Sequence, residues 1–128
     1  MKVRIQSVIR IDGSSDTVTV EHMGIRRRDG SAEVVEYAQA DSLRVEDDCV
    51  TIREAGEMRA VICLRADGVW RMTAFSTPYG DLHLEILTEE LRIMQTEQTI
   101  GISTRYRSLL DGKPFNEVRM RITVRKKE

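Results

Sequence analysis

Apolar and polar residues alternate along most of this chain, and this alternation constrains the fold more than any other feature. In the clearest run, Val118, Met120, Ile122 and Val124 are each followed by a polar or charged residue. Other runs with the same period lie at residues 3–11 (Val8 being the exception), 17–21, 43–45, 50–52 and 81–86. A period of two residues is that of a β-strand with one face buried and the other facing water. The pattern predicts a protein built from amphipathic strands.

The segments between these runs carry turn signals. The dipeptide Asp-Gly occurs at residues 12–13, 29–30, 67–68 and 111–112, each time between strand-like segments. It supplies the positive-φ residues that tight hairpins need. At the third site, a two-residue loop places Leu64 opposite Arg71, whereas a three-residue loop places Leu64 opposite Trp70. We favour the longer loop, which also places Ile62 opposite Met72, because it pairs apolar side chains with each other.

Residues 88–95 fit either a short helix capped by Thr88 or a strand that carries Leu91 and Ile93. We favour the strand, because predicted hairpins flank it. With almost no helix to cover a sheet, the strands bury their apolar face by curling onto themselves, and closure also removes exposed edges. We therefore predict an all-β fold, an antiparallel up-and-down meander of about 8–10 strands closed into a barrel. The length of 128 residues indicates a single domain over residues 1–128.

The most specific motif is Thr77-Pro78-Tyr79-Gly80, which follows Phe75 and Ser76. Spaced around it, in order, are Asp16, Gly24, Tyr37, Asp81, Leu82, Leu84, Thr88, Gly101, Ile102 and Tyr106. In this order, and over nearly the whole chain, the sequence resembles the YwiB-like family of small bacterial proteins, a domain of unknown function. The resemblance implies a lipocalin-like, calycin-type β-barrel. It implies no activity and no ligand.

Charge and motif content argue against several classes of function. Lys and Arg total 20 and Asp and Glu total 21, a balance unlike that of a generally basic nucleic-acid-binding protein. The two histidines, His22 and His83, have no Cys or carboxylate at a metal-ligand spacing and no nucleophile motif beside them. The sequence contains no glycine-rich phosphate-binding motif. We expect no enzyme activity, no metal and no cofactor.

The N-terminal segment and the cysteines indicate a compartment. Lys2, Arg4 and Arg10 interrupt the apolar residues that a signal peptide would need in an unbroken run. No stretch approaches the roughly 20 apolar residues of a membrane span. We expect a cytoplasmic protein without membrane contact, in which Cys49 and Cys63 remain thiols. The sequence leaves the oligomeric state open, a dimer included.

The two cysteines are predicted to be neighbours. If residues 55–57 form a three-residue hairpin loop closed by Glu54 and Met58, Cys49 lies directly opposite Cys63. Directly opposed Cα atoms in an antiparallel pair are about 4.5–5.5 Å apart. We therefore expect neighbouring free thiols that can be oxidised in vitro.

One functional hypothesis concerns the barrel interior. Several polar, aromatic and apolar side chains share the inward parity of the core: His22, Tyr37, Trp70, Ile102, Thr104, Tyr106, Met120 and Ile122. A few polar groups in an apolar cavity are typical of a small-molecule site. The alternative is a filled core in which each polar group bonds to the backbone. We favour a non-enzymatic binding module that holds a small apolar or amphipathic ligand.

A second hypothesis concerns the outer face. Of the 20 cationic residues 16 are arginines, and barrel closure would gather Arg4, Arg105, Arg107, Arg119 and Arg121 into a basic stripe. Such a stripe could bind RNA or an acidic protein partner. The alternative is an ordinary water-facing surface with interleaved acids, because outward strand positions are polar in any case.

Overall fold

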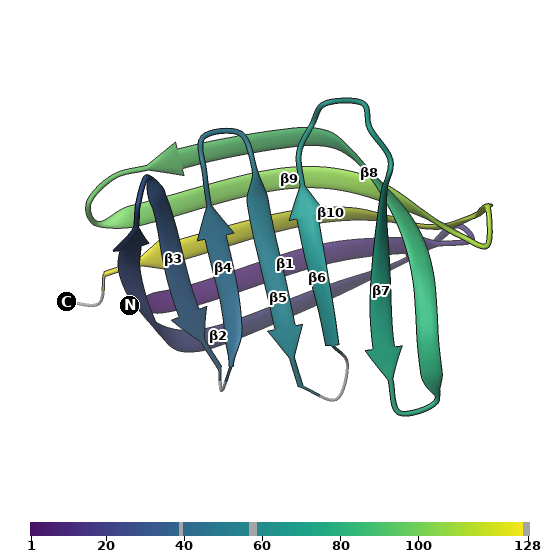
Figure 1. The fold of residues 1–128 in the computed structure, drawn as a ribbon, viewed down its shortest axis with the longest axis horizontal. Coiled ribbons are helices and arrows are strands. Elements are labelled where there is room, and N and C mark those ends of the chain that lie inside the picture. Colours follow the sequence, from purple (N-terminus) through teal and green to yellow (C-terminus); the bar gives the residue numbers. More distant parts are fainter. Residues whose placement is uncertain (39, 57–58, 127–128) are drawn as a thin grey trace.

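The computed structural model describes residues 1–38, 40–56 and 59–126, and its secondary structure there consists of β-strands and turns. Ten antiparallel strands follow one another as a meander and close into a barrel (Figure 1). The strands are β1 (Lys2–Ile11), β2 (Ser14–Asp29), β3 (Ala32–Tyr37), β4 (Asp41–Val45), β5 (Val50–Ala55), β6 (Arg59–Leu64), β7 (Arg71–Thr77), β8 (Gly80–Gln95), β9 (Thr99–Leu110) and β10 (Lys113–Arg125). The predicted all-β barrel is confirmed.

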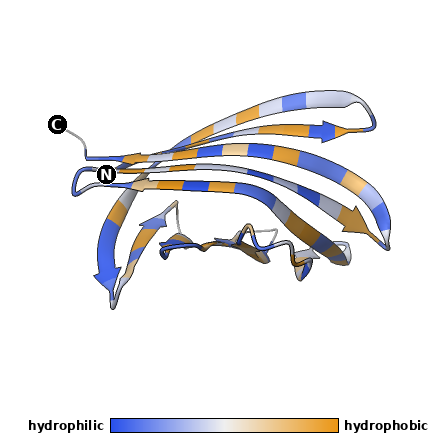
Figure 2. Cartoon of the chain, turned by 90° about the horizontal axis from the view of Figure 1, so that it is seen from above, coloured by the Kyte–Doolittle hydropathy of each residue, from blue (hydrophilic) through white to orange (hydrophobic). Residues whose placement is uncertain are grey.

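Two strands bend and thereby connect two layers. In Figure 1 the short strands β3 to β7 run across the long strands, and Figure 2 shows the two layers from above. β2 pairs with β1 as far as Met23 and with β3 from Gly24 onward. β8 pairs with β7 over Gly80–Ile86 and with β9 over Leu84–Gln95. The bends in β2 and β8 let one continuous meander enclose an interior.

Three of the four Asp-Gly dipeptides lie at tight hairpins, as predicted. Asp12 and Gly13 have φ values of 49° and 80°, and Asp111 and Gly112 have values of 52° and 78°. In these two hairpins both loop residues have positive φ, which matches the right-handed twist of the flanking strands. Gly30 follows Asp29 at φ 62°.

The fourth dipeptide corrects a prediction. Gly68 is left-handed, with φ 76°, but β6 and β7 share only the pair Arg59↔Ser76 among the described residues. That register is the one in which Leu64 would lie opposite Arg71, so the favoured three-residue loop was wrong. The predicted contact of Ile62 with Met72 is lost, because Ile62 is buried and Met72 is exposed. We call this weakly paired junction of β6 and β7 the seam.

Residues 88–95 are part of strand β8, which confirms the interpretation we favoured. A bulge between Thr88 and Glu90 shifts the register against β9. Thr88 and Leu91 therefore both lie on the inner face although they are three residues apart. This odd spacing explains why the segment also fitted a helix.

The core extends from the end of the barrel near the chain termini to the middle of the long strands, where Tyr106 and Val118 belong to it. Its most deeply buried side chains include Val3, Val35, Leu64, Ile100 and Ile122. Arg26 closes this end, since it bonds Glu33 at 3.1 Å and donates a hydrogen bond of 2.9 Å to the carbonyl oxygen of Thr96. Arg26 thereby ties β2 to the loop between β8 and β9.

Candidate functional site

The inner face of the long strands becomes progressively more exposed toward β2. One row across the sheet runs from Ile102 and Ile122, both buried, through half-buried Ile5 to Val20, which is 39% exposed. The next row begins at buried Thr104, continues through half-buried Met120 and Ser7, and ends at Val18, which is 47% exposed. Core-facing aliphatic side chains therefore meet solvent along β2.

The pairing of β2 explains this exposure. β3 begins to pair with β2 only at Gly24, so no described strand covers the second edge of residues 14–23. We call the inner face along these residues the open side. It is the best candidate site in the interior, because apolar surface that faces a barrel's inside and still meets water marks a place for a ligand.

Two tyrosines provide the polar part of this interior. Tyr37 and Tyr106 are buried on the inner face, and His22 lies beside Tyr37 with 5.9 Å between the ring centroids. Among the described residues, neither tyrosine hydroxyl forms a hydrogen bond with another protein group. These hydroxyls are available to a ligand. Met120 and Ile122 share the inner face, as predicted, but Ile122 is packed in the core.

Carboxylates complete the polar region, and the sequence reasoning missed them. Tyr37 pairs with Asp41 across β3 and β4, and continuing the β4–β5 register by one pair places Glu54 opposite Asp41. Burial, Asp41 and Glu54 together raise the pKa of Tyr37 to about 12. Burial and Glu54 raise the pKa of Tyr106 to about 12. Desolvation and the charge of Asp41 also raise the pKa of Glu54. The inward parity of Glu54 with Val50 and Ile52 was the signal that could have identified it.

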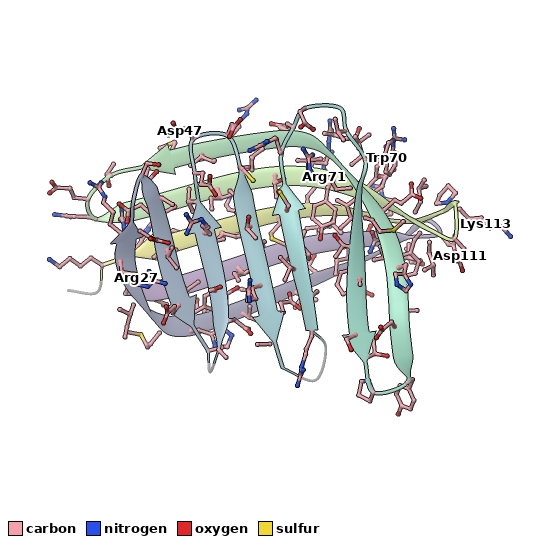
Figure 3. The ribbon with its side chains drawn as sticks, viewed as in Figure 1. Arg27, Asp47, Trp70, Arg71, Asp111 and Lys113 are labelled. Atoms are coloured by element: carbon pink, nitrogen blue, oxygen red, sulfur yellow. The ribbon has the colours of Figure 1, made fainter. Side chains whose placement is uncertain are left out.

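Trp70 does not lie with these residues, contrary to the prediction. It belongs to the loop before β7, is 37% exposed, and stacks with the guanidinium of Arg107, 5.6 Å from the ring centroid. Figure 3 shows it at the end of this loop, next to Arg71. The parity argument failed because residues 65–70 are a loop and not a continuation of strand β6.

Only part of the predicted basic stripe is available for binding. Arg4 lies 3.8 Å from Glu21, and Arg107 lies 3.7 Å from Glu89 and stacks on Trp70. Arg105 and Arg119 are directly opposite each other on β9 and β10, and Arg121 follows on β10. Within the described part of the chain, none of these last three has a carboxylate within 4.0 Å. With Gln6, Ser103 and Glu90, which is ion-paired with Arg92 at 2.9 Å, they line a hollow of about 420 Å³. We call this hollow the arginine groove.

A larger hollow, of about 880 Å³, lies on the outer face of β2 to β5. Exposed Met23 and Ile25 line it together with Arg27 and Arg44. Both arginines are already ion-paired, Arg27 with Glu36 at 3.1 Å and Arg44 with Asp29 at 2.7 Å. The sequence reasoning missed this hollow, which forms where β2 bends out of the long layer.

The motif Thr77–Gly80 forms the turn between β7 and β8. The Thr77 hydroxyl donates to the Gly80 carbonyl oxygen at 2.6 Å and accepts from the Tyr79 amide at 3.2 Å. Gly80 has φ 120°, which favours glycine, and Tyr79 is fully exposed. The motif thus has a structural role in reversing the chain.

Among the described residues, no cluster of three or more His, Cys, Asp or Glu side chains is arranged to hold a metal ion. No helix in that part of the chain has the length and apolar character of a membrane span.

Comparison with known proteins identifies the family. Residues 3–122 match a domain of unknown function, DUF1934. The chain belongs to this family. The DUF1934 barrel is similar to the crystal structure of the ywiB protein from Bacillus subtilis, with a TM-score of 0.84 and 16% sequence identity over 99% of this chain and 91% of that chain. At this identity the similarity shows the fold alone, and it confirms the resemblance found in the sequence. No curated protein matches the chain.

Proposed function

We propose that this protein is a non-enzymatic binding module that holds a small amphipathic molecule at the open side of the barrel. The observation that carries the proposal is the exposure of Val18 and Val20, whose side chains lie on the same face as the core. Such aliphatic side chains gain free energy when a ligand removes them from water. A β-barrel of this size can hold one small ligand.

The polar groups of the site suggest how the ligand is oriented. Its apolar part would lie against Val18, Val20 and half-buried Ile5 and Ile9. Its polar end would bond to the hydroxyls of Tyr37 and Tyr106, which have no partner within the described residues. Few polar groups on an apolar wall give orientation and specificity.

The test uses a reporter on the inner face, because Trp70 lies outside. Phe75 is half-buried against the core, so Phe75→Trp in a Trp70→Phe background places the single tryptophan on the inner face of the barrel. The probe is the uncharged dye N-phenyl-1-naphthylamine, whose binding quenches that tryptophan by energy transfer. We expect saturable binding that Val20→Glu abolishes. Thr19→Glu, on the outer face of the same strand, is the matched control and should leave binding intact.

The physiological ligand is sought by mass spectrometry. Protein purified from its own host is extracted with organic solvent, and the extracts of the unaltered, Val20→Glu and Thr19→Glu chains are compared. A compound present with the unaltered and Thr19→Glu chains and absent with Val20→Glu supports the proposal. The proposal is contradicted if the dye binds Val20→Glu and Thr19→Glu equally well and no extracted compound differs between these two variants. We also propose a cytoplasmic location, which cell fractionation tests.

The arginine groove favours a second candidate function, the binding of an RNA backbone. Like charges directly opposed across strands are unfavourable, and Arg105 faces Arg119 on β10, while Glu90, opposite Arg105 on β8, is ion-paired with Arg92. A phosphate group would relieve this repulsion and could accept bonds from both guanidinium groups. The arginines of the groove therefore suit a phosphate group better than the ion-paired arginines elsewhere on the surface do.

Salt-dependent binding tests this candidate. We expect a single-stranded RNA oligonucleotide to bind with an affinity that falls steeply with salt, and Arg105→Gln, Arg119→Gln and Arg121→Gln together to weaken it. The control removes three ion-paired charges away from the groove, by Arg27→Gln, Arg28→Gln and Arg44→Gln. Equal loss in both triple variants, or no RNA binding at all, rules this candidate out. Salt-sensitive capture of an acidic protein in place of RNA would assign the groove to a protein partner.

A further inference from the structure

Cys49 and Cys63 lie side by side on the outer face of the β5–β6 hairpin. Their Sγ atoms are 3.3 Å apart, and both are free thiols. The predicted proximity is confirmed, but the predicted register is wrong by two residues, because Thr51 and not Cys49 lies opposite Cys63. Glu57 and Met58, which belonged to the predicted loop and closing pair, lie outside the described residues. A shift of two residues keeps both cysteines on the same face, so the sulfurs still meet diagonally.

The guanidinium of Arg65 lies beside this thiol pair. Continuing the β5–β6 register by one pair places Arg65 opposite Cys49. The Arg65 Nε atom is buried and has no hydrogen-bond partner in the described part of the chain, while the Nη2 atom of the same guanidinium lies 3.5 Å from Asp48. Burial and the neighbouring Cys63 raise the pKa of Cys49, whereas Thr51 and Arg65 act in the opposite direction. A buried, unpartnered guanidinium nitrogen beside a thiol stabilises negative charge on sulfur.

The two thiols differ in access. Cys49 is 5% exposed, whereas Cys63 is half-buried and is the one that a small oxidant can reach. This division matches the attacking and resolving thiols of reversible oxidation sites. The arrangement is independent of the open side, which lies on the inner face.

We propose that Cys49 and Cys63 form a reversible oxidation site, at which hydrogen peroxide converts the thiol pair into an intramolecular disulfide. The Cys63 thiolate attacks one peroxide oxygen, the O–O bond breaks, and Cys63 becomes a sulfenic acid while the other oxygen leaves as hydroxide and is protonated to water. The Cys49 thiolate then attacks the Cys63 sulfur, the S–O bond breaks, and a second water leaves. Two thiols lose two electrons and two protons in total, and one peroxide is reduced to two waters.

The disulfide would act on the weakest part of the barrel. It would tie the turn before β5 to β6, and β6 forms one side of the seam, where Arg59↔Ser76 is the only described pair. Oxidation is therefore expected to slow hydrogen exchange of the β6 amides. Dithiothreitol should reverse both the bond and this effect.

Intact-mass and peptide analysis of the full chain test the proposal. After peroxide treatment we expect loss of two hydrogen atoms, no covalent dimer, a cross-linked peptide pair containing both cysteines, and recovery with dithiothreitol. Cys49→Ser should stop at a sulfenic acid on Cys63, which dimedone traps. Cys63→Ser should react more slowly than Cys49→Ser, because its remaining thiol is buried.

A measurement on the unaltered chain keeps the test valid if a variant fails to fold. Because the fold holds the sulfurs together, unfolding the chain in urea should slow intramolecular disulfide formation by about tenfold or more. The proposal is overturned if the folded chain gains oxygen at Cys63 without forming the cross-link. It is also overturned if the disulfide joins only separate chains, or if urea leaves the rate unchanged.

Discussion

At the scale of single residues, Tyr37 and Tyr106 show how the barrel sets the protonation state of a side chain. Burial is the main cause that raises the pKa of each phenol from 10.0 to about 12, and the charge of Glu54 adds to it. Both hydroxyls therefore stay protonated at physiological pH and can donate a hydrogen bond. A donor held beside exposed apolar side chains is what a ligand's polar end requires.

These raised pKa values predict an alkaline loss of stability. The folded chain favours the neutral phenol, so the contribution is complete below the unfolded pKa of 10.0 and is lost as the pH rises toward about 12. In Tyr106→Phe this loss should be smaller by on the order of 2 kcal/mol across that range. Urea denaturation at pH values between about 9 and 12 measures it. Tyr79→Phe, at a fully exposed tyrosine, is the control, and an identical pH dependence in Tyr106→Phe and the unaltered chain would contradict the prediction.

At the scale of the elements, the bend in β2 depends on Gly24. A Cβ atom at this position would lie 2.9 Å from the Glu36 carbonyl oxygen and 3.0 Å from a methyl carbon of Val3. The close approach lets β2 leave β1 and join β3 while Tyr37 packs over the bend. The position of Tyr37 in the candidate site therefore depends on a glycine one strand away.

Replacing this glycine is expected to destabilise the fold. Gly24→Ala should lower the free energy of unfolding by about 1–3 kcal/mol, because a backbone oxygen cannot easily yield to the new methyl group. Gly101→Ala is the matched control in a strand, since its Cβ would meet only Met94 at an ordinary 3.9 Å. Urea denaturation of both variants decides the point. Equal stability of the two variants would show that the bend tolerates a side chain.

The elements also show how far sequence reasoning reaches. Alternation predicted the strands and the faces of Tyr37, Tyr106 and Met120, because side-chain direction follows from the period of two. It could not fix the registers across the Gly68 and Gly56 turns, since loop length decides them. A slip of two residues left the cysteines together, whereas the slip of one at the seam reversed the expected partners.

The sequence could not place the carboxylates of the candidate site beside Tyr37, for a different reason. Asp41 and Glu54 are ordinary acidic residues in the sequence, and only the pairing of β3, β4 and β5 sets them in one row with Tyr37. Arg107 was predicted to be part of the basic stripe, but its guanidinium group stacks on the loop residue Trp70 and lies 3.7 Å from Glu89. Contacts between loops and strands carry no periodic signal, so they remained beyond prediction.

The seam predicts which backbone amides exchange their hydrogens with solvent fastest. β9 and β10 are paired over nearly their whole length, whereas β6 and β7 share one described pair. Amides that face the seam should exchange with solvent at least about tenfold faster than those between β9 and β10, because local opening there breaks fewer bonds. Hydrogen exchange followed by mass spectrometry or NMR measures the difference. Uniform protection around the barrel would mean that side-chain packing holds β6 and β7 as firmly as backbone pairing holds the other strands.

At the scale of the whole molecule, the barrel is packed at one end and open along β2. Ile100, Ile122 and Val124 are fully buried near the chain termini, whereas Ile11, Val18 and Leu82 on the same face are 41%, 47% and 42% exposed. The packed end supplies the stability that lets the other part keep apolar surface in water. This division between a rigid core and an accessible inner face is what a binding module needs.

Tyr106 lies between these two regions, so its truncation distinguishes a pocket from a packed interior. If the space around Tyr106 is filled with tightly packed side chains, Tyr106→Ala should cost about 3 kcal/mol or more, as for other large-to-small core changes. We expect a smaller loss, because its hydroxyl has no partner among the described residues and because, beyond buried Val118, the row toward β2 continues with half-buried Ile9 and exposed Asp16. We also expect the variant to lose affinity for the naphthylamine dye. Leu64→Ala, in the packed core, is the comparison and should show the full cost. Equal losses in both variants, with dye binding unchanged, would show that the interior at Tyr106 is packed and that the ligand site lies elsewhere.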